Sequence, residues 1–381
     1  MIGIKSNKIV LENEIFDGYI YLDGGKIVEV TTECKDCDTL YDMTGRYVAP
    51  GFVDTHTHGA GGHAFMNSTV EDVLLGAEFH LRHGTTSIVP TISAGTFTTM
   101  KDAVKNIDNA KKSGRAKSNI LGAHLEGPYL SASQCGAQCP TFITNPIESD
   151  YKGLIAEYGS SVTRWTYAPE QDTDGKFCNY LTSKGVIASA GHTDAKYSDM
   201  VRAVDNGCGL VTHFYSCTST VTRDHGFRSL GVIESAYLMD ELAVEIIADG
   251  KHLPPELIRL ILKLKGRDRV ILCTDSLEIA GTDITEGVMS GTEFIVEDGI
   301  CKLRDRSAFA GSVATADRLI RVLTSECGVS VVDAVYMMST NPAKILGLKK
   351  GAIKTNYDAD IVVFDDNIAI TDVFVGQNKV F

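Results

Sequence analysis

Short apolar segments alternate with longer amphipathic segments through the middle of the chain, and this alternation predicts its architecture. The apolar segments are the right length for strands and end at polar or glycine-containing turns. The stretches VEDVLLGAEFHLRHG and MKDAVKNIDNAKKSG lie between them and predict helices. About eight strand–helix units over about 250 residues match a (β/α)8 barrel better than a doubly wound open sheet. The predicted strands are residues 51–57, 86–91, 120–126, 163–168, 186–190, 210–213, 244–248 and 270–274.

The two ends of the chain show a different pattern, with short β-rich segments. Near the N-terminus these are KIVL, GYIYL, KIVEV and YVAP, with Gly24-Gly25 as a hairpin signal; near the C-terminus they are ADIVVFDD and TDVFVGQNKVF. We therefore expect an α/β protein in which residues 1–48 and 353–381 form a small β-sandwich domain. Residues 49–352 would form the catalytic barrel. Further helices are predicted within residues 315–328 and 329–347.

Composition and charge narrow the classes of function. The 381 residues carry a formal net charge of −13, which disfavours binding to nucleic acid or to anionic membrane surfaces. No apolar run approaches the roughly 20 residues that span a bilayer. The first residues, MIGIKSNKIV, lack the apolar region of a secretory signal, and the ten cysteines are scattered. We expect a cytoplasmic protein with reduced thiols, a small-molecule substrate, and neither nucleic acid nor membrane as a partner.

Histidine and carboxylate residues stand where the predicted strands end. His56 and His58 lie two residues apart behind an apolar run, so in a strand their side chains would leave the same face. In (β/α)8 barrels the loops that follow the strands carry the active site. The residues expected at this rim are His56, His58, Glu126, His192, His213 and Asp275.

The residue types at this rim indicate a metal centre. Imidazole and carboxylate ligands without thiolates suit Zn²⁺, Fe²⁺, Mn²⁺ or Co²⁺, and Glu126 could bridge two ions. A bound divalent cation makes a coordinated water acidic enough to attack near neutral pH. Asp275 would then take the proton of this water and pass it to a leaving group.

Several motifs, in a fixed order along nearly the whole chain, resemble the amidohydrolase superfamily and, within it, the N-acetylglucosamine-6-phosphate deacetylases. HLEGP and ADGxH are specific to that branch, whereas the HxH motif is shared more widely. The family's fold, a metal-bearing barrel with a small β-sandwich, agrees with the strand pattern. The motifs are VAPGFVDTHTHG, HGTTSIVPT, HLEGPYL, GHTDA, THFYS, IIADGKHL, TDSLEIAG, FAGS and NPAKILGL.

The resemblance implies roles for the rim residues. Glu126, His192 and His213 match ligands of the main metal, and His56 and His58 match ligands of a second metal that only some members bind. One or two ions per subunit are therefore expected, zinc above the others. Asp275 is similar to the catalytic acid/base and is counted among the metal ligands.

The resemblance also implies a substrate site, at which this chain departs from the family. Gln138 stands where many members have a histidine that polarises the acetyl carbonyl, and Ser216-Cys217 replaces an Asn-Ala pair that binds phosphate. Arg223 is retained although the residues after it differ. The residues expected to bind substrate are Ala137, Gln138, Ser216, Cys217, Arg223, Asp249, His252, Phe309, Ala310 and Gly311.

The expected reaction is hydrolysis of the acetamide of N-acetylglucosamine-6-phosphate to glucosamine-6-phosphate and acetate, in a homodimer. The altered phosphate loop leaves two alternatives open: deacetylation of a related sugar such as N-acetylgalactosamine-6-phosphate, or hydrolysis of a different amide. A non-catalytic scaffold is a further alternative. Such proteins usually lose metal ligands, and every ligand and Asp275 are present here.

Overall fold

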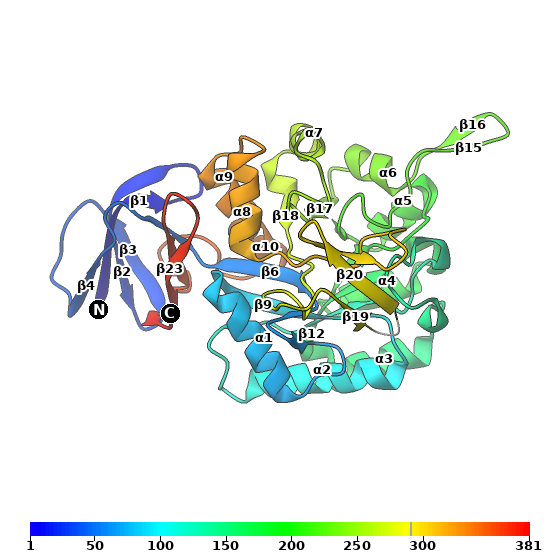
Figure 1. Cartoon of the computed structure of the whole chain (residues 1–381), viewed down its shortest axis with the longest axis horizontal. Coiled ribbons are helices and arrows are strands. Elements are labelled where there is room, and N and C mark those ends of the chain that lie inside the picture. The colour runs from blue at the N-terminus through cyan, green and yellow to red at the C-terminus, as the bar shows by residue number, and fades with distance from the viewer. Residues whose placement is uncertain (290–291) are drawn as a thin grey trace.

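The predicted strands form a parallel barrel in the computed structural model, which describes residues 1–289 and 292–381. Each strand is hydrogen-bonded to the next along the chain, and Figure 1 shows helices around the outside of this sheet. The (β/α)8 prediction is confirmed. The barrel strands are β6 (Phe52–Thr57), β9 (Thr85–Ile92), β11 (Ala123–Glu126), β12 (Val162–Tyr167), β13 (Ile187–Ala190), β14 (Leu210–Val211), β17 (Ala243–Ile246) and β18 (Val270–Leu272).

Several strands differ from their predicted extent, β17 and β18 among them by ending two residues early, and two further strands differ for local reasons. The predicted strand at residues 120–126 is interrupted, because β10 (Asn119–Ile120) pairs with β9 and the chain then bends at Gly122. Gly122 has a φ of 146°, and a Cβ atom there would lie 2.2 Å from the hydroxyl of Thr163. β14 ends at Val211, two residues early, because His213 turns out of the strand with a φ of 26°.

The barrel closes between its first and last strands beyond the end of β18. The backbone N–H of Asp275 donates to the carbonyl of His56 at 2.9 Å. This bond joins the two ends of the strand order at the rim where the predicted metal ligands lie.

Helices follow the barrel strands, and the two amphipathic stretches quoted above form α1 and α2. α1 begins with Thr69 as its N-cap, and Thr69 and Asp72 form a capping box that satisfies two N–H groups of the first turn. Among the helices within the described residues, none has both the length and the apolar composition to cross a membrane. The barrel helices are α1 (Val70–Arg82), α2 (Phe97–Lys112), α3 (Glu148–Tyr158), α4 (Lys176–Ser183), α5 (Tyr197–Asp205), α6 (Val232–Leu238), α7 (Pro255–Lys265) and α8 (Ala316–Ser325).

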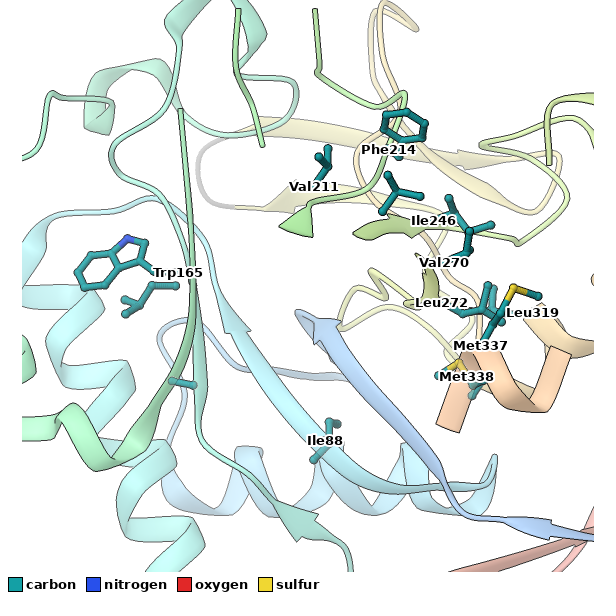
Figure 2. Close-up of a cluster of buried hydrophobic side chains, with 14 of the residues drawn as sticks. Ile88, Trp165, Val211, Phe214, Ile246, Val270, Leu272, Leu319, Met337 and Met338 are labelled. Carbon is teal, nitrogen blue, oxygen red and sulfur yellow. The ribbon is translucent and has the colours of Figure 1, made fainter. Parts of the chain in front are cut away.

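The predicted helix at residues 329–347 is a composite. It consists of α9 (Val331–Val335), a π-helical turn (Tyr336–Thr340) and α10 (Asn341–Ile345). Met337 and Met338 in the π-helical turn are buried and lie beside Val270 and Leu272 of β18 (Figure 2).

The two chain ends build one eight-stranded sheet beside the barrel (Figure 1). β1 pairs with β2 on one side and with both β4 and β5 on the other, so this single strand connects the two parts of the sheet. The sheet has its own core, which includes Ile4, Ile20, Val48 and Phe374. The division at residues 48–49 and 352–353 stays a proposal, and β5 of this sheet runs two residues past the first boundary, to Pro50. The strands are β1 (Ile2–Val10), β2 (Ile15–Asp23), β3 (Lys26–Thr31), β4 (Thr39–Asp42), β5 (Tyr47–Pro50), β22 (Ile361–Phe364), β23 (Ile370–Val375) and β24 (Asn378–Lys379).

Further short strands lie in loops at the rim, and the sequence pattern did not predict them. A hairpin of β15 (Thr222–Asp224) and β16 (Phe227–Ser229) projects away from the body of the molecule at the upper right of Figure 1. β19 (Glu286–Met289), β20 (Thr292–Glu297) and β21 (Ile300–Leu303) form an antiparallel sheet that crosses the barrel in the same view. A further antiparallel pair of two-residue strands, β7 (Gly59–Ala60) and β8 (His63–Ala64), follows His58.

Trp165 is the largest side chain of the barrel core and connects that core to the site. It is fully buried on β12, stacks on Tyr129 at a centroid distance of 5.8 Å and meets Phe177 edge-on at 5.3 Å. Its indole N–H donates to the carbonyl of Gly127 at 2.8 Å, next to the predicted ligand Glu126. Figure 2 shows it among side chains that pack between the strands and the helices.

We predict that the substitution Trp165→Ala lowers the free energy of unfolding by about 3–5 kcal/mol, because it leaves a cavity and an unpaired carbonyl at Gly127. Urea unfolding followed by circular dichroism measures the change. Leu264→Ala is the control, since Leu264 on α7 is 52% exposed and its truncation should change the free energy by about 0.5 kcal/mol or less. An equal loss for both variants would contradict the assignment.

Candidate metal centre

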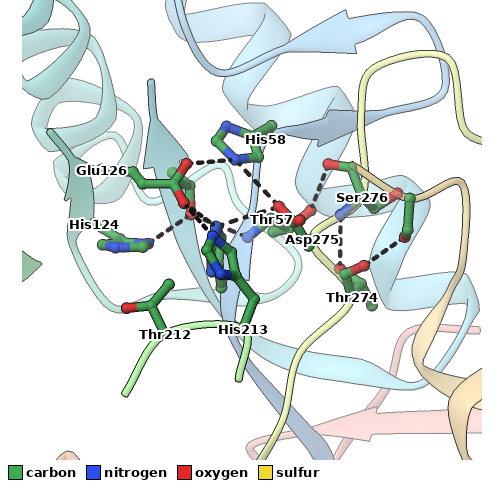
Figure 3. A network of polar contacts seen from close by, with 12 residues as sticks. Thr57, His58, His124, Glu126, Thr212, His213, Thr274, Asp275 and Ser276 are labelled. Carbon is green, nitrogen blue, oxygen red and sulfur yellow. Dashed lines mark hydrogen bonds and ion pairs between the residues drawn. The ribbon is translucent and has the colours of Figure 1, made fainter. Parts of the chain in front are cut away.

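The six predicted rim residues come together at the carboxyl ends of the barrel strands. Figure 3 shows His58, Glu126, His213 and Asp275 facing one another. His56 lies in β6 and His58 just after it, Glu126 ends β11, and Asp275 follows β18. His192 and His213 follow β13 and β14. All six residues are at least nine-tenths buried. Figure 3 shows the carboxylate of Glu126 facing the rings of His58 and His213.

One group of three donors consists of Glu126, His192 and His213. Oε1 of Glu126 lies 3.1 Å from Nε2 of each histidine, and the two Nε2 atoms are 3.0 Å apart. Ligand atoms about 3.3 Å apart are expected around a tetrahedral ion with bonds of about 2.0 Å. The three atoms therefore have the spacing of one face of a metal site.

A second group consists of His56, His58 and Glu126, with Asp275 beside them. Nε2 of His58 lies 3.2 Å from Oε2 of Glu126, and Nε2 of His56 lies 3.4 Å from Oε1. Oδ1 of Asp275 is 3.3 Å from both histidine Nε2 atoms. Nε2 of His56 is buried without a hydrogen-bond partner, so this donor set fits a cation. Glu126 belongs to both groups: Oε1 faces His56, His192 and His213, and Oε2 faces His58.

The other ring nitrogen of each histidine is held by the protein. Nδ1 of His192 and Nδ1 of His213 face the backbone carbonyls of Gln134 and Ser216 at 2.9 and 3.1 Å. Nδ1 of His58 faces the hydroxyl of Ser93 at 3.0 Å. An N–H donated at Nδ1 leaves the lone pair on Nε2, which is the arrangement of metal-binding histidines.

The neighbouring His124 differs from the ligands. Its Nε2 and Nδ1 atoms face the hydroxyls of Thr166 and Thr91 at 2.7 and 3.0 Å, and its ring packs edge-on against His56. Burial holds the pKa of His124 well below its usual value. It is therefore a neutral packing residue beneath the site.

The charges of the site balance only with added positive charge. Burial opposes ionisation of Glu126 and Asp275, but the facing histidines, His56 foremost, lower the pKa of both carboxyl groups. Burial likewise opposes protonation of His56 and His58, yet the two carboxylates raise their pKa values to about 10 and about 9. Without a cation the site therefore holds protons, which a metal ion would displace.

Three of the rim residues have backbone conformations that side chains rarely adopt. The φ angles are 47° at His192, 26° at His213 and 47° at Asp275. Non-glycine residues in this region are strained and persist where surrounding contacts hold them, most often at functional sites. The strain aims all three side chains inward from strands that would otherwise continue.

A cavity of about 550 Å³ opens above the six rim residues. Most of the predicted substrate-binding residues line it, together with five of the six rim residues; His56 lies beneath them. No lysine or arginine occurs among the described residues of the lining. The predicted substrate-binding residues in the lining are Ala137, Gln138, Ser216, Cys217, His252, Phe309, Ala310 and Gly311.

Gln138 is fixed in orientation by two contacts. Its Oε1 accepts from the N–H of Ala94 at 2.9 Å, and its Nε2 donates to Oε2 of Glu126 at 2.7 Å. One amide hydrogen remains for a ligand in the cavity.

Two predicted substrate-binding residues lie outside the lining. Asp249 is 2% exposed and its Oδ2 lies 2.9 Å from Nδ1 of His252, so it supports His252 rather than facing the cavity. Arg223 lies in β15 on the projecting hairpin and does not line the cavity of its own chain.

Other lining residues escaped the sequence reasoning. Glu278 follows Asp275 within the same TDSLE motif, and Met66 and Asn67 follow the HxH motif, so nearness to a ligand was the available signal. Val288, from β19, reaches the cavity from a sheet that the pattern did not predict, and no local signal marks it.

Comparisons with known proteins agree with this geometry. The amidohydrolase family matches residues 47–381. The N-acetylglucosamine-6-phosphate deacetylase of Bacillus subtilis (strain 168) is 30% identical over 380 residues, covering 96% of this chain and 94% of the relative. The deacetylase of that name from Lysinibacillus sphaericus is 29% identical over 354 residues, covering 92% and 90%.

Solved structures give the same result. A mutant N-acetyl-D-glucosamine-6-phosphate deacetylase of Mycobacterium smegmatis, in complex with N-acetyl-D-glucosamine-6-phosphate, matches with a TM-score of 0.91 and 27% identity. The match covers 100% of this chain and 99% of that one. The deacetylase of Pasteurella multocida matches with a TM-score of 0.92 and 27% identity over 99% of each chain. A barrel with an HxH motif and further ligands at its strand ends defines a metal-dependent hydrolase. The chain belongs to the amidohydrolase family.

We predict that metal affinity rises steeply with pH. Because the pKa values of His56 and His58 lie near 10 and 9 in the cation-free site, binding must release protons at neutral pH. Each displaced proton weakens apparent affinity about tenfold per pH unit of acidification. Competition with a zinc chelator between pH 6 and pH 8 should show a slope of at least one proton.

One variant and one control test whether the second donor group causes this pH dependence. His58→Ala should flatten this slope, because it removes one of the protons to be displaced, whereas His63→Ala should leave it unchanged. His63 bonds Asp72 near the surface and belongs to neither group. A pH-independent affinity in the wild-type protein would contradict the charge balance described above.

Proposed function

We propose that this protein hydrolyses the acetamide of N-acetylglucosamine-6-phosphate, releasing acetate and glucosamine-6-phosphate. The single observation that carries the proposal is the pair of donor groups that share Glu126 beneath the cavity. The names of the relatives supply the substrate, because proteins that match over nearly the full length are deacetylases of this sugar phosphate.

The proposed cofactor is a divalent cation, one or two per chain, with zinc first among zinc, iron, manganese and cobalt. Imidazole and carboxylate donors at this spacing suit zinc. The cluster formed by Glu126, His192 and His213 contains no cysteine. When bound, such an ion lowers the pKa of a coordinated water and polarises a carbonyl group.

Asp275 has the position and charge of the proton carrier. It lines the cavity beside both donor groups, and its lowered pKa keeps it ionised and able to accept a proton at neutral pH. The same carboxyl group can then deliver that proton to the amine that leaves. The free amide hydrogen of Gln138 faces the cavity and would donate to the carbonyl oxygen as negative charge develops on it.

The rest of the cavity would hold the sugar. Asp249 fixes Nδ1 of His252, which leaves Nε2 for the ligand, and Phe309 meets the His252 ring edge-on at 5.1 Å. Ser216 and Cys217 line the part of the cavity near His213 and stand where the family binds phosphate.

We propose a homodimer in which Arg223 reaches the partner's cavity. The cavity of a single chain contains no lysine or arginine among its described lining residues, although the substrate carries a phosphate. Arg223 lies on a hairpin that projects outward, and Phe227 on the same hairpin is 80% exposed, as expected for a side chain that a second copy covers.

We also propose a cytoplasmic location, since all ten cysteines are free thiols.

The first test is acetate release by zinc-loaded protein from N-acetylglucosamine-6-phosphate. We predict that Asp275→Asn lowers kcat by about 10²–10⁴-fold, the usual contribution of a positioned acid/base. Asp172→Asn is the control, because the buried side chain of Asp172 accepts from the N–H groups of Phe177 and Cys178 in the first turn of α4, away from the cavity. The kcat of this variant should stay within about threefold. Faster hydrolysis of the unphosphorylated or the galacto sugar would overturn the substrate assignment.

The second test addresses the partner subunit. Arg223→Ala should raise KM for the phosphorylated sugar by about 10-fold or more with a smaller change in kcat, because a lost charged hydrogen bond costs about 1.5–3 kcal/mol. Lys251→Ala, outside the lining, is the charge-matched control. Sedimentation velocity should show a dimer. A monomer with full activity would contradict this arrangement.

A further inference from the structure

One histidine of the site is held differently from the other three. Nδ1 of His192, His213 and His58 faces a neutral acceptor, either a backbone carbonyl or a hydroxyl. Nδ1 of His56 instead lies 2.9 Å from Oε1 of Glu245, a carboxylate with no exposed surface. Glu245 lies in β17, inside the barrel and beneath the cavity, and does not line it.

The carboxylate of Glu245 is paired with an equally buried arginine. Both Nη atoms of Arg164, on β12, donate to Glu245, the longer of the two bonds being 3.1 Å. Thr55 adds a hydroxyl bond to Oε2 at 3.2 Å. These three donors fix the position of the carboxylate that faces His56.

The same pair also reaches the other donor group. Oε1 of Glu245 accepts the backbone N–H of His213 at 3.2 Å, and Arg164 donates to the hydroxyl of Thr212 at 2.8 Å. These bonds hold the chain where His213 leaves β14 with its strained φ of 26°. Oε1 of Glu245 thus fixes the side chain of His56 in the second donor group and the backbone of His213 in the first.

We propose that Glu245, held in place by Arg164, is a positioning residue that makes His56 a metal ligand. By accepting the proton on Nδ1, Glu245 selects the tautomer whose lone pair lies on Nε2. Neither residue touches the substrate cavity, so both act only through His56 and His213.

A purely structural ion pair would make a different prediction. Such a pair could be replaced by apolar side chains of similar size with little effect on anything but stability. The positioning role requires an acceptor at Nδ1 of His56 whatever the charges are. Two double variants separate these cases, because both remove the two charges and only one removes the acceptor.

The experiment compares Arg164→Met/Glu245→Gln, which retains an acceptor, with Arg164→Met/Glu245→Leu, which does not. Zinc content per chain and zinc affinity are measured by chelator competition without any substrate. We expect zinc affinity at the second donor group, which contains His56, to fall about 10–100-fold in the leucine variant and less than about threefold in the glutamine variant. Equal affinities in the two variants would overturn the proposal.

A second measurement needs no variant, in case the leucine protein fails to fold. In zinc-loaded wild-type protein with ¹⁵N-labelled histidine, the His56 ring should show a slowly exchanging proton on Nδ1 and a metal-shifted Nε2. A proton on Nε2 would overturn the proposal. The inference rests on the proposed metal-dependent function, but the outcomes differ: wild-type protein that binds no zinc would overturn that function, whereas zinc binding that is indifferent to the acceptor overturns only the role of Glu245.

Discussion

The carboxylate of Glu126 is the feature on which the site depends. Glu126 is 2% exposed, and its carboxylate lies within 3.4 Å of a nitrogen atom of five side chains: the four histidines of the rim and the amide of Gln138. A buried charge of this kind is costly unless it is compensated, and a cation between Glu126 and the imidazoles is the compensation that suits the donor atoms. The strain at His192 and His213 and the tight contacts around Trp165 and Gly127 are consistent with a scaffold built to hold this one group in place.

The sequence was most informative where local pattern and strand ends decide the structure. The eight barrel strands were predictable because each is a short apolar run, and the rim residues followed because parallel strands place their carboxyl ends at one edge. The loops were less predictable. The hairpin of β15 and β16 and the sheet of β19 to β21 depend on contacts outside their own segments. The sequence therefore gave no signal for Val288, which lines the cavity. Arg223 was predicted to bind substrate but does not line the cavity of its own chain.

Residues beneath the rim were invisible to the sequence for another reason. Arg164 and Glu245 lie in strands 81 positions apart, and nothing in either segment shows that they form a pair. Barrel interiors are normally filled by apolar layers, so a charged pair at this depth was not expected from the strand pattern. Its cost in desolvation is met by bonds to Thr55, Thr212 and His213 as well as to His56, and a function at the rim accounts for a feature that stability alone would not favour.

The way the barrel closes has a consequence for how the molecule moves. Its first and last strands are clasped at the top by the bond from the Asp275 amide to the His56 carbonyl, so the seam of the cylinder runs through two residues of the reaction centre. A cation bound there would cross-link the first and last strands, and its loss would weaken the contact between them. Opening of this seam and release of the cation would therefore be coupled.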